Sequence, residues 1–408
     1  MRKKIDLGIA VRAGTVGIRF FLPVFILALA DQEELGRYYL YTSAIALIIF
    51  SITFELNLFF AKAYVNNPSK ESIFQHFEGI LKASLILYAT FGTPALIGFL
   101  WWSEARDHTL YVTAFFYVGS EVVVNEYGRY LTNISQVKSV VFRDLYRAVS
   151  IVVAGILSLV LCNRIISWEY FFAFGLLNTA LLMFEYFDAK RGVSELIPRV
   201  GMHQHFRHTI SAIGQTKGAV AQSGIVYLYP LIERIILERT VGLTVLGGYA
   251  FLSSVVQAAV SVMFLPAIAR FRTLVLQLEG FHRAKESSKI PGLASFTLKI
   301  FGIGALVVLG LQLIGALELF EGKFHIDPWF SITALVGVAA NNLVYVVSPD
   351  FAKAGRVFTS TLVTSAIYVF SLLCAFLSFS FVAANHMVLG MILGVGFMLQ
   401  IAVRQRYL

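Results

Sequence analysis

The sequence predicts an all-α membrane protein, and its composition and long apolar runs carry that prediction. Of the 408 residues, 58% are apolar and only 14% are charged. A soluble domain carries about a quarter of its residues as Asp, Glu, Lys and Arg, so most of this surface is expected to face lipid. Runs of about 20 apolar residues, long enough to span a bilayer, recur along the chain. They leave no room for a large soluble domain.

The apolar runs predict twelve transmembrane helices, centred near residues 19, 49, 90, 119, 152, 178, 228, 255, 306, 338, 368 and 394. The first run is too long, and too lacking in a small-residue cleavage site, to be a signal peptide. We expect two six-helix bundles, over residues 1–187 and 218–408. A basic cytoplasmic linker over residues 188–217 would join them.

The net charge of +9 follows this topology. If the N-terminus is cytoplasmic, most of the 33 Lys and Arg residues fall in inner tails and loops, including an expected inner loop over residues 127–147. Positive charge concentrates in the short cytoplasmic loops of membrane proteins. Both termini are therefore predicted to be cytoplasmic, and the basic charge is no sign of nucleic-acid binding.

A short internal repeat indicates that the chain is a duplication. Leu-Gly-Arg-Tyr at residues 35–38 returns 211 residues later as Leu-Gly-Gly-Tyr at residues 246–249. Both copies adjoin short predicted outer loops, over residues 31–37 and 238–244. Solenoid repeats have periods of roughly 20 to 50 residues, so this spacing indicates two copies of a multi-helix unit. Six helices separate the copies, which makes the repeat parallel, and such symmetry is typical of transporters.

Candidate binding residues are charged side chains at depths where the bilayer penalises them. An Arg at a helix centre costs about 2.5 to 3.5 kcal/mol, so it tends to face a water-filled cavity. Arg12 and Arg19 are seven residues apart, on nearly one face of the first helix. Two guanidinium groups there would suit a pyrophosphate. Alternatively, Arg12 reaches the inner headgroups and Arg19 forms a structural ion pair.

A polar stripe on the fourth predicted helix extends this candidate cavity. Glu121, Asn125 and Arg129 follow one another at spacings of four, which places them on one helical face. The stripe predicts either a cavity wall with a protonation site, or an interhelical salt bridge for which Arg19 is one partner. Further candidate substrate-binding residues in the second half are Lys299, Asn341 and Asn342, although the two Asn residues fit helix–helix contacts equally well.

Ion coupling would need an acidic residue within the membrane. Glu55, Glu121 and Glu233 are the candidates if a proton or sodium gradient drives the protein, while Glu233 also fits a structural role beside Arg234. No catalytic residue, metal site or cofactor is expected. The chain has no P-loop, its two cysteines lack metal-ligand spacing, and its linker histidines have no acidic partner at such spacing.

The second half resembles a known transporter superfamily. The carrying residues are Tyr-Leu-Tyr-Pro-Leu-Ile-Glu-Arg at 227–234, the repeat at 246–249, and Pro-Ala-Ile-Ala-Arg-Phe at 266–271. They resemble the multidrug/oligosaccharidyl-lipid/polysaccharide exporter superfamily, and within it the O-antigen flippases (Wzx-like polysaccharide transporters). The resemblance extends over the whole chain in length, helix count, topology and duplication.

This resemblance implies flipping of a polyprenyl-pyrophosphate-linked oligosaccharide, such as an O-antigen unit, across the bacterial cytoplasmic (inner) membrane. Polysaccharide or lipopolysaccharide biosynthesis would be its setting, with glycan polymerase or chain-length proteins as partners. A drug or metabolite antiporter of the same superfamily is the alternative. It would favour an acidic cavity, whereas Arg12, Arg19 and Lys299 make this one basic; Glu55 and Glu121 keep it open. A membrane-embedded glycan polymerase or ligase would need a large outer loop, and every predicted outer loop is short.

Overall fold

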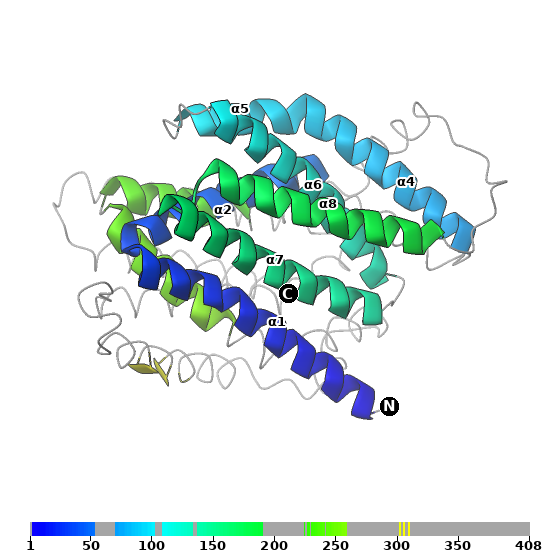
Figure 1. Ribbon diagram of the computed structural model, residues 1–408, viewed down its shortest axis with the longest axis horizontal. Coiled ribbons are helices and arrows are strands. Elements are labelled where there is room, and N and C mark those ends of the chain that lie inside the picture. Colours follow the sequence, from blue (N-terminus) through cyan, green and yellow to red (C-terminus); the bar gives the residue numbers. More distant parts are fainter. Residues whose placement is uncertain are drawn as a thin grey trace, which may run out of the picture. The chain divides into compact units, whose positions relative to one another are not determined.

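The protein is described by a computed structural model. In the first half it describes residues 2–53, 70–102, 108–133 and 137–190. In the second half it describes a smaller set, namely residues 224, 227–228, 230–240, 242–258, 302, 305–306 and 309–310. Every regular element among these residues is a helix (Figure 1), as the sequence predicts.

The helices of the first half are long. In chain order they are α1 (Arg2–Leu29), α2 (Gln32–Thr53), α4 (Lys70–Leu87), α5 (Thr93–Trp102), α6 (His108–Asn133), α7 (Val137–Cys162) and α8 (Trp168–Lys190). A π-helical turn, η1 (Tyr88–Gly92), joins α4 to α5. Two helices of the second half follow, over residues 230–240 and over Leu243–Ala258. The first eight predicted segments fall on these helices; the other four lie almost wholly outside the described residues.

Several of these helices are suited to a lipid environment. Within the described residues, four spans are long and apolar enough to cross a membrane: Gln32–Thr53, Leu81–Trp101, Phe142–Cys162 and Trp168–Phe187. Large apolar side chains such as Trp101 and Val160 are 80% and 69% exposed. Soluble monomers rarely expose extensive apolar surface, whereas lipid solvates it. The protein is therefore a polytopic membrane protein.

The span over Leu81–Trp101 changes its helical register next to Pro94. Proline has no N–H and cannot bond to the carbonyl four residues earlier. Just before it, the Thr93 N–H bonds to the carbonyl of Tyr88, five residues back, which closes the π-helical turn. The Tyr88 hydroxyl donates to the Phe115 carbonyl at 2.5 Å. This bond fixes the turn against α6.

By its internal contacts the chain divides into two compact units. Unit 1 consists of Met1–Leu22 and Tyr41–Leu228, and unit 2 of Pro23–Leu40 and Tyr229–Leu408. The predicted linker over residues 188–217 lies outside the described residues from residue 191 onward. Its boundaries therefore stay a prediction.

Unit 1 is organised around α6, which packs most closely on α8 and also contacts α4 and α7 (Figure 1). The two backbones lie close together at Gly175, where an added Cβ would lie 3.3 Å from the Tyr117 Cα. The Tyr117 ring stacks on Phe171 and Phe174 of α8, with centroids 5.4 and 5.0 Å apart. This close approach brings the next turn of α6 against α8.

Unit 2 contains both copies of the repeated turn, and their helix boundaries are equivalent. α1 ends at Leu29, and the helix over residues 230–240 ends 211 positions later. α2 begins at Gln32, and the next helix begins 211 positions later at Leu243. The duplication read from the sequence is therefore present in the backbone of the turns.

The hydrogen bonds of the two turns are equivalent as well. The Leu35 N–H bonds to the Asp31 carbonyl at 3.4 Å, and the Leu246 N–H bonds to the Gly242 carbonyl at 3.1 Å. The predicted outer loop over residues 31–37 is wrong in extent, because α2 already begins at Gln32. Asp31 caps this helix by accepting the Glu34 N–H on Oδ1 at 2.8 Å.

Candidate functional site

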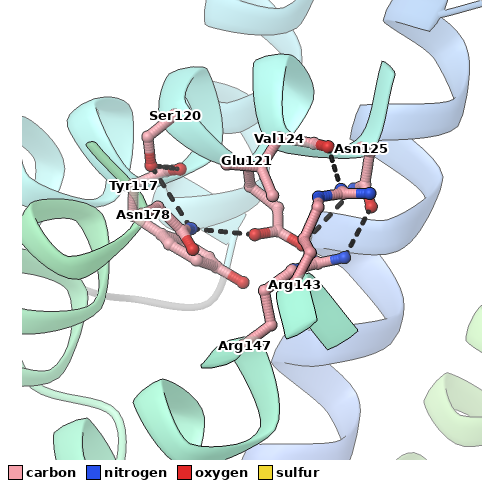
Figure 2. A network of polar contacts seen from close by, with 8 residues as sticks. All are labelled: Tyr117, Ser120, Glu121, Val124, Asn125, Arg143, Arg147 and Asn178. Carbon is pink, nitrogen blue, oxygen red and sulfur yellow. Dashed lines mark hydrogen bonds and ion pairs between the residues drawn. The ribbon is translucent and has the colours of Figure 1, made fainter. Parts of the chain in front are cut away.

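A buried polar network joins three helices of unit 1 (Figure 2). Its side chains are Ser120, Glu121 and Asn125 of α6, Arg143 and Arg147 of α7, and Asn178 and Glu185 of α8. Side chains three, four or seven residues apart share one face of a helix. Glu121 and Asn125, Arg143 and Arg147, and Asn178 and Glu185 are spaced in this way, so each pair faces the same junction.

Glu121 is the centre of the network, and its carboxylate is held by three donors. Oε1 forms an ion pair with the Arg147 guanidinium and accepts from Asn125 Nδ2 at 3.3 Å. Oε2 accepts from Asn178 Nδ2 at 2.9 Å. Glu121 is only 6% exposed. Burying a carboxylate is costly unless it is paired and hydrogen-bonded, and these donors meet that requirement.

The two asparagines extend the network on either side of Glu121. Asn125 bridges the ion pair, because its Oδ1 accepts from Arg147 at 3.1 Å. Asn178 also reaches the Ser120 hydroxyl at 3.5 Å. Its Oδ1 is buried without a hydrogen-bond partner among the described residues. Asn178 Oδ1 and Glu185 Oε2, which is also buried without such a partner, are therefore acceptors that the network leaves open.

A second ion pair lies one helical turn away on α7. Arg143 Nε lies 3.6 Å from Glu185 Oε1, and the guanidinium also donates to the Val124 carbonyl. Gly128 makes room for it, since a Cβ there would overlap the Arg143 guanidinium. The two arginines of α7 are thus held by carboxylates from different helices, Glu121 from α6 and Glu185 from α8.

The charges of the network are paired within it. Two guanidinium groups and two carboxylates balance each other in charge. Among the described residues, no His, Cys, Asp and Glu side chains are grouped to hold a metal ion.

The structure brings two of the predicted site residues together. Glu121 and Asn125 lie in one network, and Arg147 supplies an interhelical salt bridge of the kind predicted for Glu121. Arg19 is exposed on α1. Arg12 also lies in α1, but its side chain is outside the described part. The other cavity and coupling candidates lie outside the described residues; they are Glu55, Lys299, Asn341 and Asn342.

Glu233 belongs to unit 2 and has a different environment. Its Oε1 accepts the hydroxyl of Tyr249 at 2.6 Å. The neighbouring Arg234 donates to the Tyr39 carbonyl at 2.7 Å and lies over the Tyr39 ring, 5.3 Å from its centroid. Both the structural role and the coupling role of Glu233 stay predictions.

Sequence reasoning missed five members of the network: Ser120, Arg143, Arg147, Asn178 and Glu185. The expected inner loop over residues 127–147 is wrong, because α6 continues to Asn133 and α7 begins at Val137. Both arginines are therefore helical and inward-facing. Their spacing of four repeats the spacing of Glu121 and Asn125, and that match was the available signal. Asn178 and Glu185 are likewise seven residues, two turns, apart.

Comparisons with known proteins place the fold. No protein-family model matches the chain, and no curated protein matches it in sequence. Among solved structures it is similar to the eukaryotic MATE transporter AtDTX14, with 15% identity and a TM-score of 0.56, over 98% of this chain and 93% of that one. It is also similar to a multidrug resistance MATE family transporter of the MOP superfamily in an inward-facing conformation. There the identity is 11% and the TM-score 0.60, over 98% of both chains.

The chain has the fold of MATE transporters. At these identities the likeness concerns the fold alone. The MATE fold accounts for the all-helical architecture and for the near-complete overlap in length. It also agrees at the level of fold with the superfamily that the sequence resembles.

Proposed function

We propose that this protein is a secondary transporter that works by alternating access. We further propose that its substrate is a polyprenyl-pyrophosphate-linked oligosaccharide, flipped across the bacterial cytoplasmic membrane. The observation that carries the transporter proposal is the MATE fold, which extends over 98% of the chain. The two equivalent turns of unit 2 support it, because transporters are commonly built from internal repeats.

The proposed anionic substrate rests on charge. A cationic drug would need a carboxylate whose charge is available to it. Glu121 is buried and its charge is already balanced by Arg147. Arg19 is exposed near the middle of the first predicted span. A guanidinium group binds two phosphate oxygens at once, so Arg19 suits a pyrophosphate better than a cation.

A drug or metabolite antiporter is the second candidate. The description of one structural neighbour as a multidrug resistance transporter favours it. In that case an acidic side chain such as Glu233 or Glu55 would attract the substrate. The two candidates differ in the sign of the substrate's charge, and this difference makes them separable by experiment.

Proteoliposomes that contain the purified full-length chain distinguish the candidates. One set carries a polyprenyl-pyrophosphate oligosaccharide with a fluorescent label on the sugar, and externally added dithionite measures how fast the label changes leaflet. A second set carries a fluorescent cationic dye and a proton or sodium gradient. We expect accelerated flipping of the glycolipid. Gradient-driven dye transport without glycolipid flipping would support the antiporter instead.

The role of Arg19 is tested in the same vesicles. Arg19→Ala is expected to abolish glycolipid flipping at an unchanged protein level, and Arg19→Lys to restore part of it because the charge is kept. Arg239→Ala is the matched control, since its side chain is 60% exposed at the end of the helix over residues 230–240. Normal flipping by Arg19→Ala would exclude Arg19 from pyrophosphate binding.

Coupling is tested at Glu121. A glutamine cannot exchange a proton, so Glu121→Gln is expected to remove the dependence of transport on the pH gradient. Glu78→Gln is the control, because Glu78 also pairs with a cation, Lys82, at 3.3 Å, but its side chain is 33% exposed. A dependence that survives in Glu121→Gln leaves Glu55 and Glu233 as the coupling candidates.

A further inference from the structure

The two copies of the repeated turn make a reciprocal backbone contact within unit 2. A Cβ added to Gly36 would overlap the Leu243 carbonyl oxygen, and a Cβ added to Gly247 would overlap the Gln32 carbonyl oxygen. Gly36 and Gly247 are 211 positions apart, and so are Gln32 and Leu243. A contact in which each partner repeats the other's role is the product of a local two-fold axis.

This contact depends on the absence of side chains. The added Cβ atoms would also lie 3.2 Å from the Gly247 nitrogen and 2.9 Å from the Gly36 nitrogen. Glycine allows helix backbones to approach this closely within a membrane protein. At these two positions no side chain separates the backbones. The crossing is therefore suited to repeated closing and opening.

One side chain of the second half also reaches the first copy of the turn. Arg234 donates to the Tyr39 carbonyl at 2.7 Å and covers the Tyr39 ring. Tyr39 follows Gly36 by three residues, one turn along α2, and is 6% exposed. Arg234 thus binds the helix that carries Gly36, close to the crossing itself.

We propose that the crossing of Gly36 and Gly247, clasped by Arg234 on Tyr39, is a gate at the predicted outer face and is closed in this structure. The proposal rests on the alternating access proposed above. In such a cycle the two halves of a parallel repeat separate on the outer side when the substrate leaves. The contacts that join the two copies of the outer turn are the ones that must then break.

A cysteine below the crossing reports on the gate. Ser43 lies on α2 seven residues after Gly36, and so on nearly the same face about 10 Å deeper; it is 6% exposed. Ser43→Cys is placed in a full-length chain in which the native cysteines are removed by Cys162→Ser and Cys374→Ser. Its reaction rate with a membrane-impermeant maleimide, added from the outside of cells, measures how often the gate is open.

Alanine at either glycine should hold the gate open. Alanine is the better helix former, so a defect would come from the contact rather than from the helix. We expect Gly36→Ala and Gly247→Ala each to raise the labelling rate about tenfold. That corresponds to about 1.4 kcal/mol, which lies within the usual cost of an overpacked contact. Arg234→Gln should raise the rate less, because the crossing itself remains.

Gly98→Ala is the matched control, because nothing lies within 4 Å of the Cβ it would add in α5. Its labelling rate should equal that of the parent chain. Unchanged labelling in folded Gly36→Ala, Gly247→Ala and Arg234→Gln chains would overturn the gate and make the crossing a static joint. If the glycine variants do not fold, Arg234→Gln alone decides. The labelling needs no glycolipid, so a failed flipping assay would refute the proposed substrate and leave this result standing.

Discussion

The polar network of unit 1 and the paired turns of unit 2 bring helices together by opposite means. In the network, charged side chains reach between helices, and the Glu121 carboxylate is satisfied by donors from the next turn of α6, from α7 and from α8. At the paired turns, the side chain is missing, and Gly36 and Gly247 let the backbones meet directly. Both sites are closely packed, but charged side chains hold the network together, whereas backbone atoms meet at the crossing of Gly36 and Gly247.

The difference shows how each site responds to change. Removing one partner of a buried ion pair costs more stability than removing both, because the single remaining charge has no compensation. A close backbone contact at glycine is destabilised by any added side-chain atom, whatever its charge. The network is therefore sensitive to the removal of a charged side chain, and the paired turns are sensitive to side-chain atoms added at their glycines. The following predictions test this contrast from the largest expected effect to the smallest.

Removal of Arg147 should give the largest loss. Arg147→Ala leaves the buried Glu121 carboxylate without its counter-charge, so we expect the free energy of unfolding to fall by about 3 to 5 kcal/mol. Denaturant unfolding of the purified protein in detergent measures it. The double variant Arg147→Ala, Glu121→Gln should recover a large part of the loss. An equal loss in both chains would contradict the charge argument.

An added methyl group inside the network should come next. Gly128→Ala places its Cβ on the Arg143 guanidinium, so Arg143 must move away from Glu185 and the Val124 carbonyl. We expect a loss of about 1 to 3 kcal/mol in the same unfolding measurement. Gly98→Ala, which meets open space in α5, should be neutral or slightly stabilising. Similar behaviour of the two alanine variants would mean that Gly128 is not needed for packing.

The two turns should then differ at equivalent positions. Gly242 has a φ of 87°, in the left-handed region that favours glycine. Gly242→Ala is therefore expected to cost about 1 to 2 kcal/mol of unfolding free energy, as judged from the shift in the denaturation midpoint. An unchanged midpoint would show that the second turn does not need this conformation.

The smallest effect is expected at Asp31, the equivalent of Gly242. Asp31→Ala removes the cap on the Glu34 N–H and should cost about 1 kcal/mol. Asp31→Gly, which copies the residue of the second turn, should cost only a few tenths of a kcal/mol. If glycine proved as harmful as alanine here, the aspartate would act through something other than capping.

Much of the fold could be predicted because lipid imposes a simple rule. A span needs about 20 apolar residues, and the first eight predicted segments fall on helices in the described residues. The helix ends were less predictable. α7 begins at Val137, whereas the sequence predicted a loop up to Arg147. The prediction failed because a basic residue that is paired inside the protein cannot be told from a loop residue in the sequence.

The site could be predicted only in part. The four-residue spacing of Glu121 and Asn125 marks a polar face, but spacing within one helix does not say which helix lies opposite. The partners Arg147 and Asn178 follow from the packing of α6 against α7 and α8, which depends on small residues such as Gly175. Nor could the sequence show that Gly36 and Gly247 touch, although it showed that they correspond.

The reciprocal crossing of Gly36 and Gly247 also bears on the ancestry of the chain. A surface that contacts its own repeat in this way is self-complementary, as the interfaces of symmetric homodimers are. A half-length ancestor that carried one Leu-Gly turn could have paired with a second copy of itself through the same backbone surface. Gene fusion would then have preserved a subunit interface inside one polypeptide, while Asp31 and Gly242 diverged around it.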